Sequence, residues 1–204
     1  MEEQIAFRVA HLTEYQDAAY ATRYGDKVGA FEGALREAVA QGYHKVLSYK
    51  DEYEVARLLL KTREKAEAQF DGAFKMTHHM APPLLSRKQF NGRPKKSAMP
   101  QLMNKAMPLL ARMKRVRGTV FDVFGRTKER RMERELITQY EADLDEISNS
   151  VRPDTMEAAV ALARLPLEMR GFGPVKQKNV TQAAKRREEL LAVLRAAPLQ
   201  SVAE

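Results

Sequence analysis

The chain has 204 residues, of which 44% are hydrophobic and 30% charged, and its formal net charge is +8 at pH 7. It contains no cysteine, which excludes disulfides, thiolate nucleophiles, and zinc or iron–sulfur sites held by cysteine. A positive surface suits an acidic partner such as nucleic acid, an acidic protein or an anionic substrate, and composition does not choose among them.

The sequence gives no sign of a targeting or membrane segment. The N-terminal residues MEEQIAFRVAHL open with acids and lack a basic segment before an apolar one, unlike a secretory signal. No uncharged apolar run approaches the ~18 residues of a membrane span. We therefore expect a soluble, cytoplasmic protein with no membrane partner.

In the first half of the chain, hydrophobic residues recur at steps of three and four, which places side chains on one face of a helix. Two such stripes are present, and we expect each to lie on one helix. They are Ile5, Val9, Leu12, Tyr15 and Ala19, followed by Val46, Tyr49, Tyr53, Ala56 and Leu60.

Three further helices are predicted in the second half. One begins near Thr127, a suitable N-cap. Another opens at Asp154, which has Glu157 at the spacing of a capping box, and runs through Leu165. The last carries the stripe Val180, Ala183, Ala184, Leu191 and Leu194.

Three stretches are less regular. Residues 70–85, FDGAFKMTHHMAPPLL, predict an extended segment that ends in a polyproline-like turn. Residues 86–98 predict a basic surface loop. In residues 117–126, Gly118 suits a helix C-cap before a short strand or loop. Together these patterns predict a mainly α fold with at most a small two-stranded β element. We expect a single α-rich domain over 1–197 and a disordered tail over 198–204.

The adjacent histidines 78 and 79 raise the question of a metal site. In an extended segment, neighbouring side chains point to opposite faces, so the two do not suit one ion. His11 and His44 fall in distant predicted helices with no pattern linking them. We predict no metal site, with one of the paired histidines facing the core and the other facing solvent or a partner.

Two basic stretches each allow two interpretations. RGFGPVKQKN, residues 170–179, suits either a phosphate loop or a tight turn with Pro174 starting a helix, and we favour the turn. RTKERRMER, residues 126–134, suits either anion contacts or a solvated helix face whose interleaved glutamates neutralise the arginines. Some of these arginines could instead pair with a buried acid such as Asp122. Nothing else predicts a nucleophile–base pair or a cofactor loop.

Four blocks in register resemble the C-terminal domain of indolepyruvate ferredoxin oxidoreductase-like proteins, and the likeness extends over nearly the whole chain. The blocks are YKDEYEVARL at 49–58, FDGAFKMTHHMAPPLL at 70–85, RGTVFDVFGRTKERRMER at 117–134, and LPLEMRGFGPVKQKN at 165–179. The resemblance implies a parent enzyme that oxidatively decarboxylates aryl 2-oxo acids. In that family thiamine diphosphate, magnesium, iron–sulfur clusters and coenzyme A take part in the reaction.

None of the corresponding motifs is in this chain, which has no GDG motif and no cysteine. The resemblance therefore implies an accessory domain that holds no cofactor and is not catalytic alone. In that context the basic face could dock onto the catalytic domains or subunits of the parent, attract acidic ferredoxin, or help bind the anionic coenzyme, and docking is the simplest of the three. The positions that match, as candidate interface or anion-contact residues, are His79, Asp122, Arg126, Arg131, Arg170 and Lys176.

Two other interpretations of the function remain open. A basic helical module could bind nucleic acid or another polyanion, although the interleaved acids and the lack of a reader motif argue against it. A free-standing enzyme could use His79 with Asp122 or an arginine, if those groups lie within hydrogen-bond reach. The accessory-domain reading predicts that segments 74–83, 117–126 and 170–176 converge on one face.

Overall fold

The computed structural model describes residues 1–72, 76–77, 79–80, 97–98, 101–171 and 173–196, without the side chains of 79–80, 97–98 and 101–104. The described part is mainly α-helical, which confirms the predicted fold class. Its β structure is one short antiparallel pair, β1 (His79–Met80) with β2 (Ser97–Ala98). Of the predicted loop at 86–98 only β2 is described, and the predicted tail lies outside the described residues.

The chain divides into two compact units, which we describe separately. Unit 1 comprises Met1–Tyr49 and Lys128–Glu204, and unit 2 comprises Lys50–Thr127. The single domain expected over 1–197 stays a prediction. None of the helices in the described residues combines the length and the apolar composition that a membrane crossing requires.

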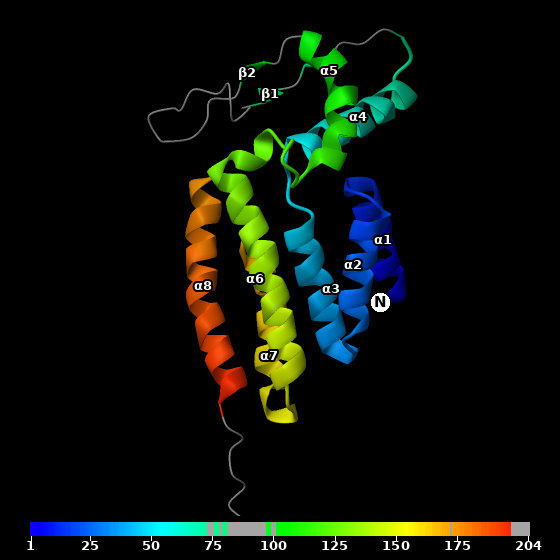
Figure 1. Cartoon of the computed structure of the whole chain (residues 1–204). Coiled ribbons are helices and arrows are strands. Elements are labelled where there is room, and N and C mark those ends of the chain that lie inside the picture. Colours follow the sequence, from blue (N-terminus) through cyan, green and yellow to red (C-terminus); the bar gives the residue numbers. More distant parts are fainter. Residues whose placement is uncertain (73–75, 78, 81–96, 99–100, 172, 197–204) are drawn as a thin grey trace, which may run out of the picture. The chain divides into compact units, whose positions relative to one another are not determined.

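Unit 1 is a bundle of six α-helices (Figure 1). They are α1 (Glu2–Tyr15), α2 (Ala18–Gly29), α3 (Gly33–Leu47), α6 (Lys128–Ser150), α7 (Met156–Arg164) and α8 (Pro174–Arg195). Two short 3-10 turns, η3 (Pro153–Thr155) and η4 (Leu165–Glu168), flank α7.

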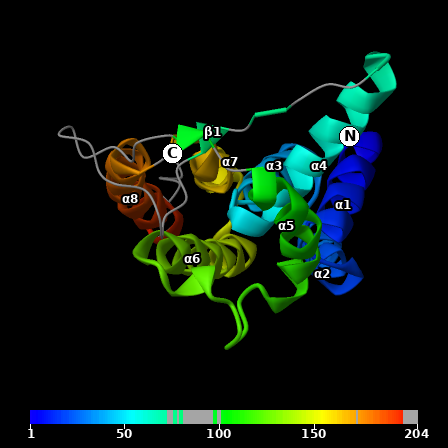
Figure 2. The same cartoon turned by 90° about the horizontal axis from the view of Figure 1, so that it is seen from above.

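Helix α3 is the centre of this bundle. It contacts α1, α2, α6 and α7, and the view from above places it between the pair α1–α2 and the group α6–α8 (Figure 2). The helix is amphipathic: Arg36, Glu37, Gln41 and Lys45 lie along one side and are not buried, and the apolar residues of the other sides pack into the bundle. Its buried residues are Leu35, Ala38, Val39, Ala40, Gly42, Tyr43, Val46 and Leu47.

Three helices of unit 1 approach one another closely at Gly42. A Cβ atom there would lie 2.0 Å from the carbonyl oxygen of Ala163 on α7 and 2.4 Å from the hydroxyl of Tyr140 on α6. The Tyr140 hydroxyl donates to that same Ala163 carbonyl, at 2.7 Å. The missing side chain of Gly42 thus makes room for a buried hydrogen bond between α6 and α7.

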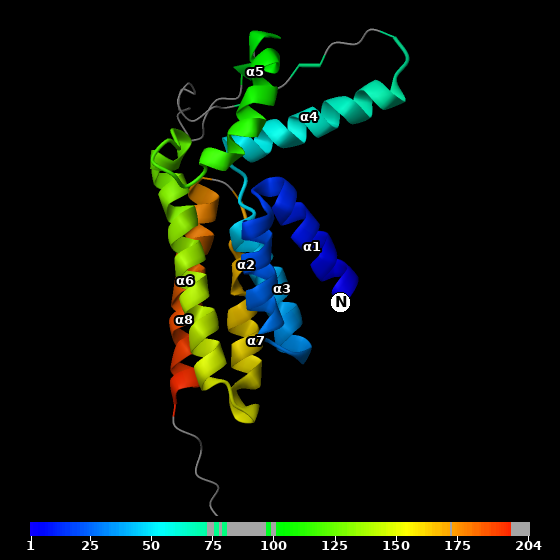
Figure 3. The same cartoon turned by 45° about the vertical axis from the view of Figure 1, so that its right-hand side comes forward.

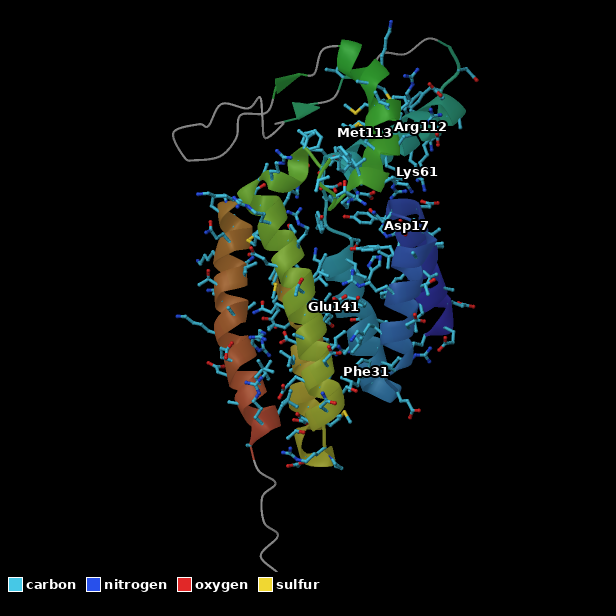
Figure 4. All side chains as sticks on the ribbon, in the orientation of Figure 1. Asp17, Phe31, Lys61, Arg112, Met113 and Glu141 are labelled. Carbon is cyan, nitrogen blue, oxygen red and sulfur yellow. The ribbon has the colours of Figure 1, made fainter. Side chains whose placement is uncertain are left out.

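Glu141, near the middle of α6, joins three helices (Figure 4). Its carboxylate accepts a short hydrogen bond from the hydroxyl of Tyr43 on α3 and pairs with Arg23 on α2 at 2.5 Å. Burial, and then the hydrogen bond to Glu141, raise the pKa of Tyr43, so the phenol stays protonated and acts as a donor.

The two predicted N-terminal stripes are interrupted, which corrects the sequence-based expectation. Helix α1 ends at Tyr15, and Asp17 caps a new helix by accepting from the backbone N–H of Tyr20 at 2.8 Å. Likewise α3 ends at Leu47, and Asp51 caps the next helix by accepting from the N–H of Glu54 at 2.8 Å. In both places an aspartate offers the backbone N–H groups a partner that an unbroken helix would not.

The later helix starts are closer to expectation. Helix α6 begins directly after Thr127, as predicted. The predicted cap at Asp154 is wrong, because a 3-10 turn comes first. There the Thr155 hydroxyl accepts from the N–H of Arg152 at 3.0 Å, and Asp154 pairs with the Arg152 side chain at 3.2 Å.

Unit 2 contains α4 (Glu52–Gln69), the β1–β2 pair, α5 (Gln101–Arg112), η1 (Met113–Val116) and η2 (Phe124–Arg126). Helix α5 packs against the first half of α4, and the second half of α4 extends past it (Figure 3). Among the described residues of unit 2, the buried apolar ones are Tyr53, Ala56 and Met107. Buried charged groups make up much of the rest of its interior.

Candidate interaction site

The segment from Arg117 to Thr127 in unit 2 folds as a series of tight turns. Gly118 has φ +76°, a left-handed conformation that glycine adopts without strain, so the chain can turn sharply after η1. The N–H of Thr119 donates to Val116 O at 3.0 Å, and the N–H of Asp122 donates to Thr119 O at 3.1 Å. We call residues 117–127 the turn loop.

A buried ion pair holds the start of the turn loop to α4. The guanidinium of Arg117 donates two hydrogen bonds to the Asp51 carboxylate, from Nε to Oδ2 at 2.5 Å and from Nη2 to Oδ1 at 3.0 Å. Both side chains are almost fully buried, at 5% and 3% exposed. Because Asp51 is also the N-cap of α4, one carboxylate fixes both the helix start and the loop.

The carboxylate of Asp122 holds the middle of the turn loop. Its Oδ1 accepts from the Tyr53 hydroxyl at 3.0 Å and from the N–H of Gly125 at 2.9 Å, and its Oδ2 accepts from the N–H of Gly118 at 2.8 Å. Burial, followed by the bond to Asp122, raises the pKa of Tyr53 and keeps its hydroxyl a donor. The Tyr53 ring also packs edge-on against Phe124, at 5.5 Å between ring centroids.

Asp122 is buried, whereas three apolar side chains of the turn loop face solvent. Val120, Phe121 and Val123 are 77%, 75% and 59% exposed. Isolated exposed apolar residues are ordinary, but three in four successive positions on an anchored loop form a cluster. In the sequence VFDVF, residues 120–124, the usual pattern of burial is reversed: the charged Asp122 is buried, and three of the apolar residues around it are exposed.

The segment that contains this cluster, residues 112–127, is positively charged. Arg112, Arg115 and Arg126 are exposed, and Asp122 is the only acid in residues 112–127. Arg126 donates to the carbonyl of Val120 at 3.2 Å, which keeps its charge next to the apolar residues. Figure 4 labels Arg112 and Met113 where α5 passes into η1.

Asp122 and Arg126 are thus the predicted site residues that the structure places in this site. Asp122 was a candidate for interface or anion contacts, with pairing to nearby arginines as an alternative, and its bonds to Tyr53 and to two backbone N–H groups give it a positioning role within the loop. The sequence reading missed Asp51, Tyr53 and Arg117. Asp51 did carry a signal, since Asp51 and Glu54 have the D-x-x-E spacing of a helix start.

Three other predicted residues lie in unit 1, near the starts of α6 and α8. Lys176 on α8 binds both oxygens of Glu133 on α6, at 2.5 and 2.6 Å, in a largely buried pair. Arg170 is exposed, and its Nε donates to Leu167 O at 2.8 Å. Arg131 is exposed on α6. Lys176 therefore has a structural partner, whereas Arg131 and Arg170 remain interface predictions.

His79 lies in β1, where its backbone pairs with Ala98. Its side chain lies outside the described residues, so the pairing with Asp122 stays a hypothesis. Most of segment 74–83 also lies outside them. Segments 117–126 and 170–176 belong to different units, so their convergence on one face stays a prediction.

The turn reading of RGFGPVKQKN agrees with the structure. Gly171 and Gly173 have φ +102° and +56°, and α8 begins at Pro174. The side chain of Asn179 donates to the carbonyl of Arg170 at 2.8 Å and closes the turn.

The structure also joins two histidines that sequence left unconnected. His44 Nε2 on α3 lies 3.1 Å from His11 Nδ1 on α1. The described part of the chain contains no group of three or more His, Asp or Glu residues that could hold a metal ion. The histidine pair is part of the contact between α1 and α3.

A protein-family model described as "Family of unknown function (DUF6537)" matches residues 1–189. The chain belongs to the DUF6537 family. The match covers all of unit 2 and, in unit 1, every helix through most of α8. No curated protein and no solved structure matches this DUF6537 chain significantly.

Proposed function

We propose that this chain is an accessory domain of an indolepyruvate ferredoxin oxidoreductase-type enzyme, and that it docks onto the catalytic domains of that enzyme. The four blocks that resemble the C-terminal domain of such proteins support the proposal. Two of them contain the residues that build the turn loop, at 49–58 and 117–134. The proposal places the protein in the cytoplasm, which the lack of cysteine suits.

The observation that carries the docking role is the exposed cluster on the anchored turn loop. Val120, Phe121 and Val123 face solvent, while two buried carboxylates hold the backbone that presents them. Loops on a rigid scaffold are frequent contact surfaces. Exposing three apolar side chains without a partner would only favour aggregation.

In this proposal the other domains hold the cofactors. Thiamine diphosphate and magnesium need a diphosphate motif, and the clusters need cysteine ligands, neither of which this chain has. The catalysed reaction is the oxidative decarboxylation of an aryl 2-oxo acid, with coenzyme A as acyl acceptor and ferredoxin as electron acceptor. This chain would contribute docking or closure, and His79, Arg131 and Arg170 would be further contact residues.

The test is co-elution of the chain with the thiamine- and cluster-bearing remainder of the enzyme, with indolepyruvate oxidation assayed with and without it. We expect a stable complex at low and moderate salt, and oxidation that depends on the chain. Absence of both a complex and an effect on activity would refute the proposal.

Nucleic-acid binding is the alternative that the net charge of +8 suggests. Several cations of unit 1 are paired with acids, which lowers the charge available to phosphates. These pairs include Arg23–Glu141, Arg187–Asp143, Arg195–Glu146 and Lys176–Glu133. A gel shift with nonspecific DNA at low salt tests it, because phosphate binding is strongest there. A shift that disappears steeply as salt rises would favour this alternative.

A further inference from the structure

We propose that the turn loop inserts Phe121 into an apolar cleft of a partner protein whose rim carries carboxylates. The identity of that partner rests on the proposed function, since the catalytic remainder of the oxidoreductase is the partner we expect. The chemistry of the cleft rests on the turn loop alone.

The apolar part of the argument is the position of Phe121. It lies between Val120 and the buried Asp122, with Val123 next, and it is 75% exposed. Aromatic residues that enter a desolvated pocket dominate the binding energy of many interfaces, while their neighbours mainly exclude water. Phe121 suits the central position, and the two valines suit the surrounding contact.

The loop is also preorganised for binding. Arg117 is held by Asp51, and Asp122 binds Tyr53, Gly118 and Gly125. A loop already fixed in one conformation does not lose that freedom on binding, so more of the contact energy appears as affinity. A fixed shape favours a partner that also has a fixed shape, which is why we infer a protein cleft and not a fluid lipid surface.

The charge part of the argument concerns Arg112, Arg115 and Arg126. All three are exposed, and the segment that carries them has no exposed acid to neutralise them. Arg126 is tied to the backbone of Val120, directly beside Phe121. A partner surface with carboxylates around the cleft would complement these charges, speed association and fix orientation.

The first experiment tests this chemistry without assuming a partner. A random-peptide phage library is selected on the immobilised full-length chain. We expect enriched peptides that combine aromatic or aliphatic residues with flanking Asp or Glu. Phe121→Ser should weaken their binding by at least about tenfold, as expected for an anchor residue. The matched control is Phe7→Ser, because Phe7 on α1 is 71% exposed and lies in unit 1.

Charge is tested in the same assay. The double substitution Arg112→Glu and Arg115→Glu should weaken binding and reduce its salt dependence. The matched control is Lys178→Glu with Lys185→Glu, two exposed positions on α8. Peptides that are basic, that bind the Phe121→Ser variant equally well, or that fail to enrich would overturn the inference. So would Phe121-dependent binding to phosphatidylserine vesicles, which would identify a membrane instead.

The second experiment uses the complex with the catalytic remainder. A photo-crosslinking benzoylphenylalanine replaces Phe121, and mass spectrometry locates the linked peptide. We expect an apolar segment flanked by carboxylates. If the phage selection yields the expected peptides but no complex with the catalytic remainder forms, the proposed function fails and the inferred chemistry of the cleft stands. If the complex forms but Phe121→Ser weakens neither assay, the loop chemistry fails and the proposed function stands.

Discussion

His44 Nε2 and His11 Nδ1 lie 3.1 Å apart, so α1 and α3 are joined by two imidazole rings that share one hydrogen bond. Burial is the main reason that the pKa of His44 is lowered from 6.5 to about 4, and electrostatic interactions with His11, Arg8 and Lys45 lower it further. The neutral ring is thus the form that the folded state favours.

This shift predicts a loss of stability on mild acidification. Between pH 6.5 and 4 the unfolded state binds a proton at His44 that the folded state does not. The free energy of unfolding therefore falls as the pH falls through that window, by up to about 3 kcal/mol at about 1.4 kcal/mol per pKa unit. The contribution of the neutral His44 ring to the free energy of unfolding is fully present above pH 6.5.

The variant His44→Phe keeps a ring at this position and removes its titration. Urea unfolding at pH 7.5, 5.5 and 4.5 should show a flatter pH dependence for His44→Phe than for the parent chain. Comparing the two cancels the carboxylates that titrate in both. An equal loss in both proteins would show that His44 is not the titrating group.

Gly42→Ala should destabilise unit 1, because the new methyl group would overlap the Ala163 carbonyl and the Tyr140 hydroxyl. Overpacking of this kind costs about 1–3 kcal/mol or more. The control is Gly25→Ala in α2, where nothing lies within 4 Å of the new Cβ. That change should stabilise by up to about 1 kcal/mol through helix propensity. Thermal unfolding of both variants checks the prediction, and equal melting temperatures would contradict it.

Arg117→Met should destabilise unit 2 by about 3–5 kcal/mol, because it leaves the Asp51 carboxylate buried without its charged partner. Arg63→Met is the control, since Arg63 pairs with Glu67 at the surface of the same unit and should matter by less than about 0.5 kcal/mol. Hydrogen exchange gives the local readout. We expect faster exchange across residues 117–127 in Arg117→Met only.

Lys176→Met should lower the stability of unit 1 by about 3 kcal/mol, because Glu133 would remain largely buried without its ammonium partner. Lys178→Met, two residues along the same helix and exposed, should have almost no effect. Chemical denaturation compares the two. If Lys176→Met proves harmless to stability but weakens the complex with the oxidoreductase, Lys176 has the contact role that the sequence predicted.

The sequence predicted which segments are helical better than it predicted where each helix begins and ends. The starts of α6 and α8 could be predicted because Thr127 and Pro174 act locally, on the first turn that follows them. The breaks at Asp17 and Asp51 were concealed, because the apolar spacing continues across them. An aspartate that caps a helix competes with that spacing, and the stripe alone does not show which effect is stronger.

The candidate site could be predicted only in part. Asp122 was recognised as a buried acid, but its partner Tyr53 lies 69 positions away and Arg117 lies 66 positions from Asp51. Contacts at such separations depend on how α4 meets the turn loop, which no local pattern records. The same limit explains why His11 and His44, 33 positions apart, were read as unrelated.

Unit 2 interrupts unit 1 in the sequence, since residues 50–127 lie between the helices of one bundle. On the ribosome, α3 therefore emerges well before α6 and α7, the helices that cover it. At ~5–20 residues per second, the intervening segment delays them by roughly 4–16 s. During that interval α1 and α2 can pack against α3, but the side of α3 that meets α6 and α7 has no cover, whereas α4, α5 and the turn loop can already assemble. The nascent chain should therefore present a chaperone-binding segment at Leu35–Leu47 until translation passes α7.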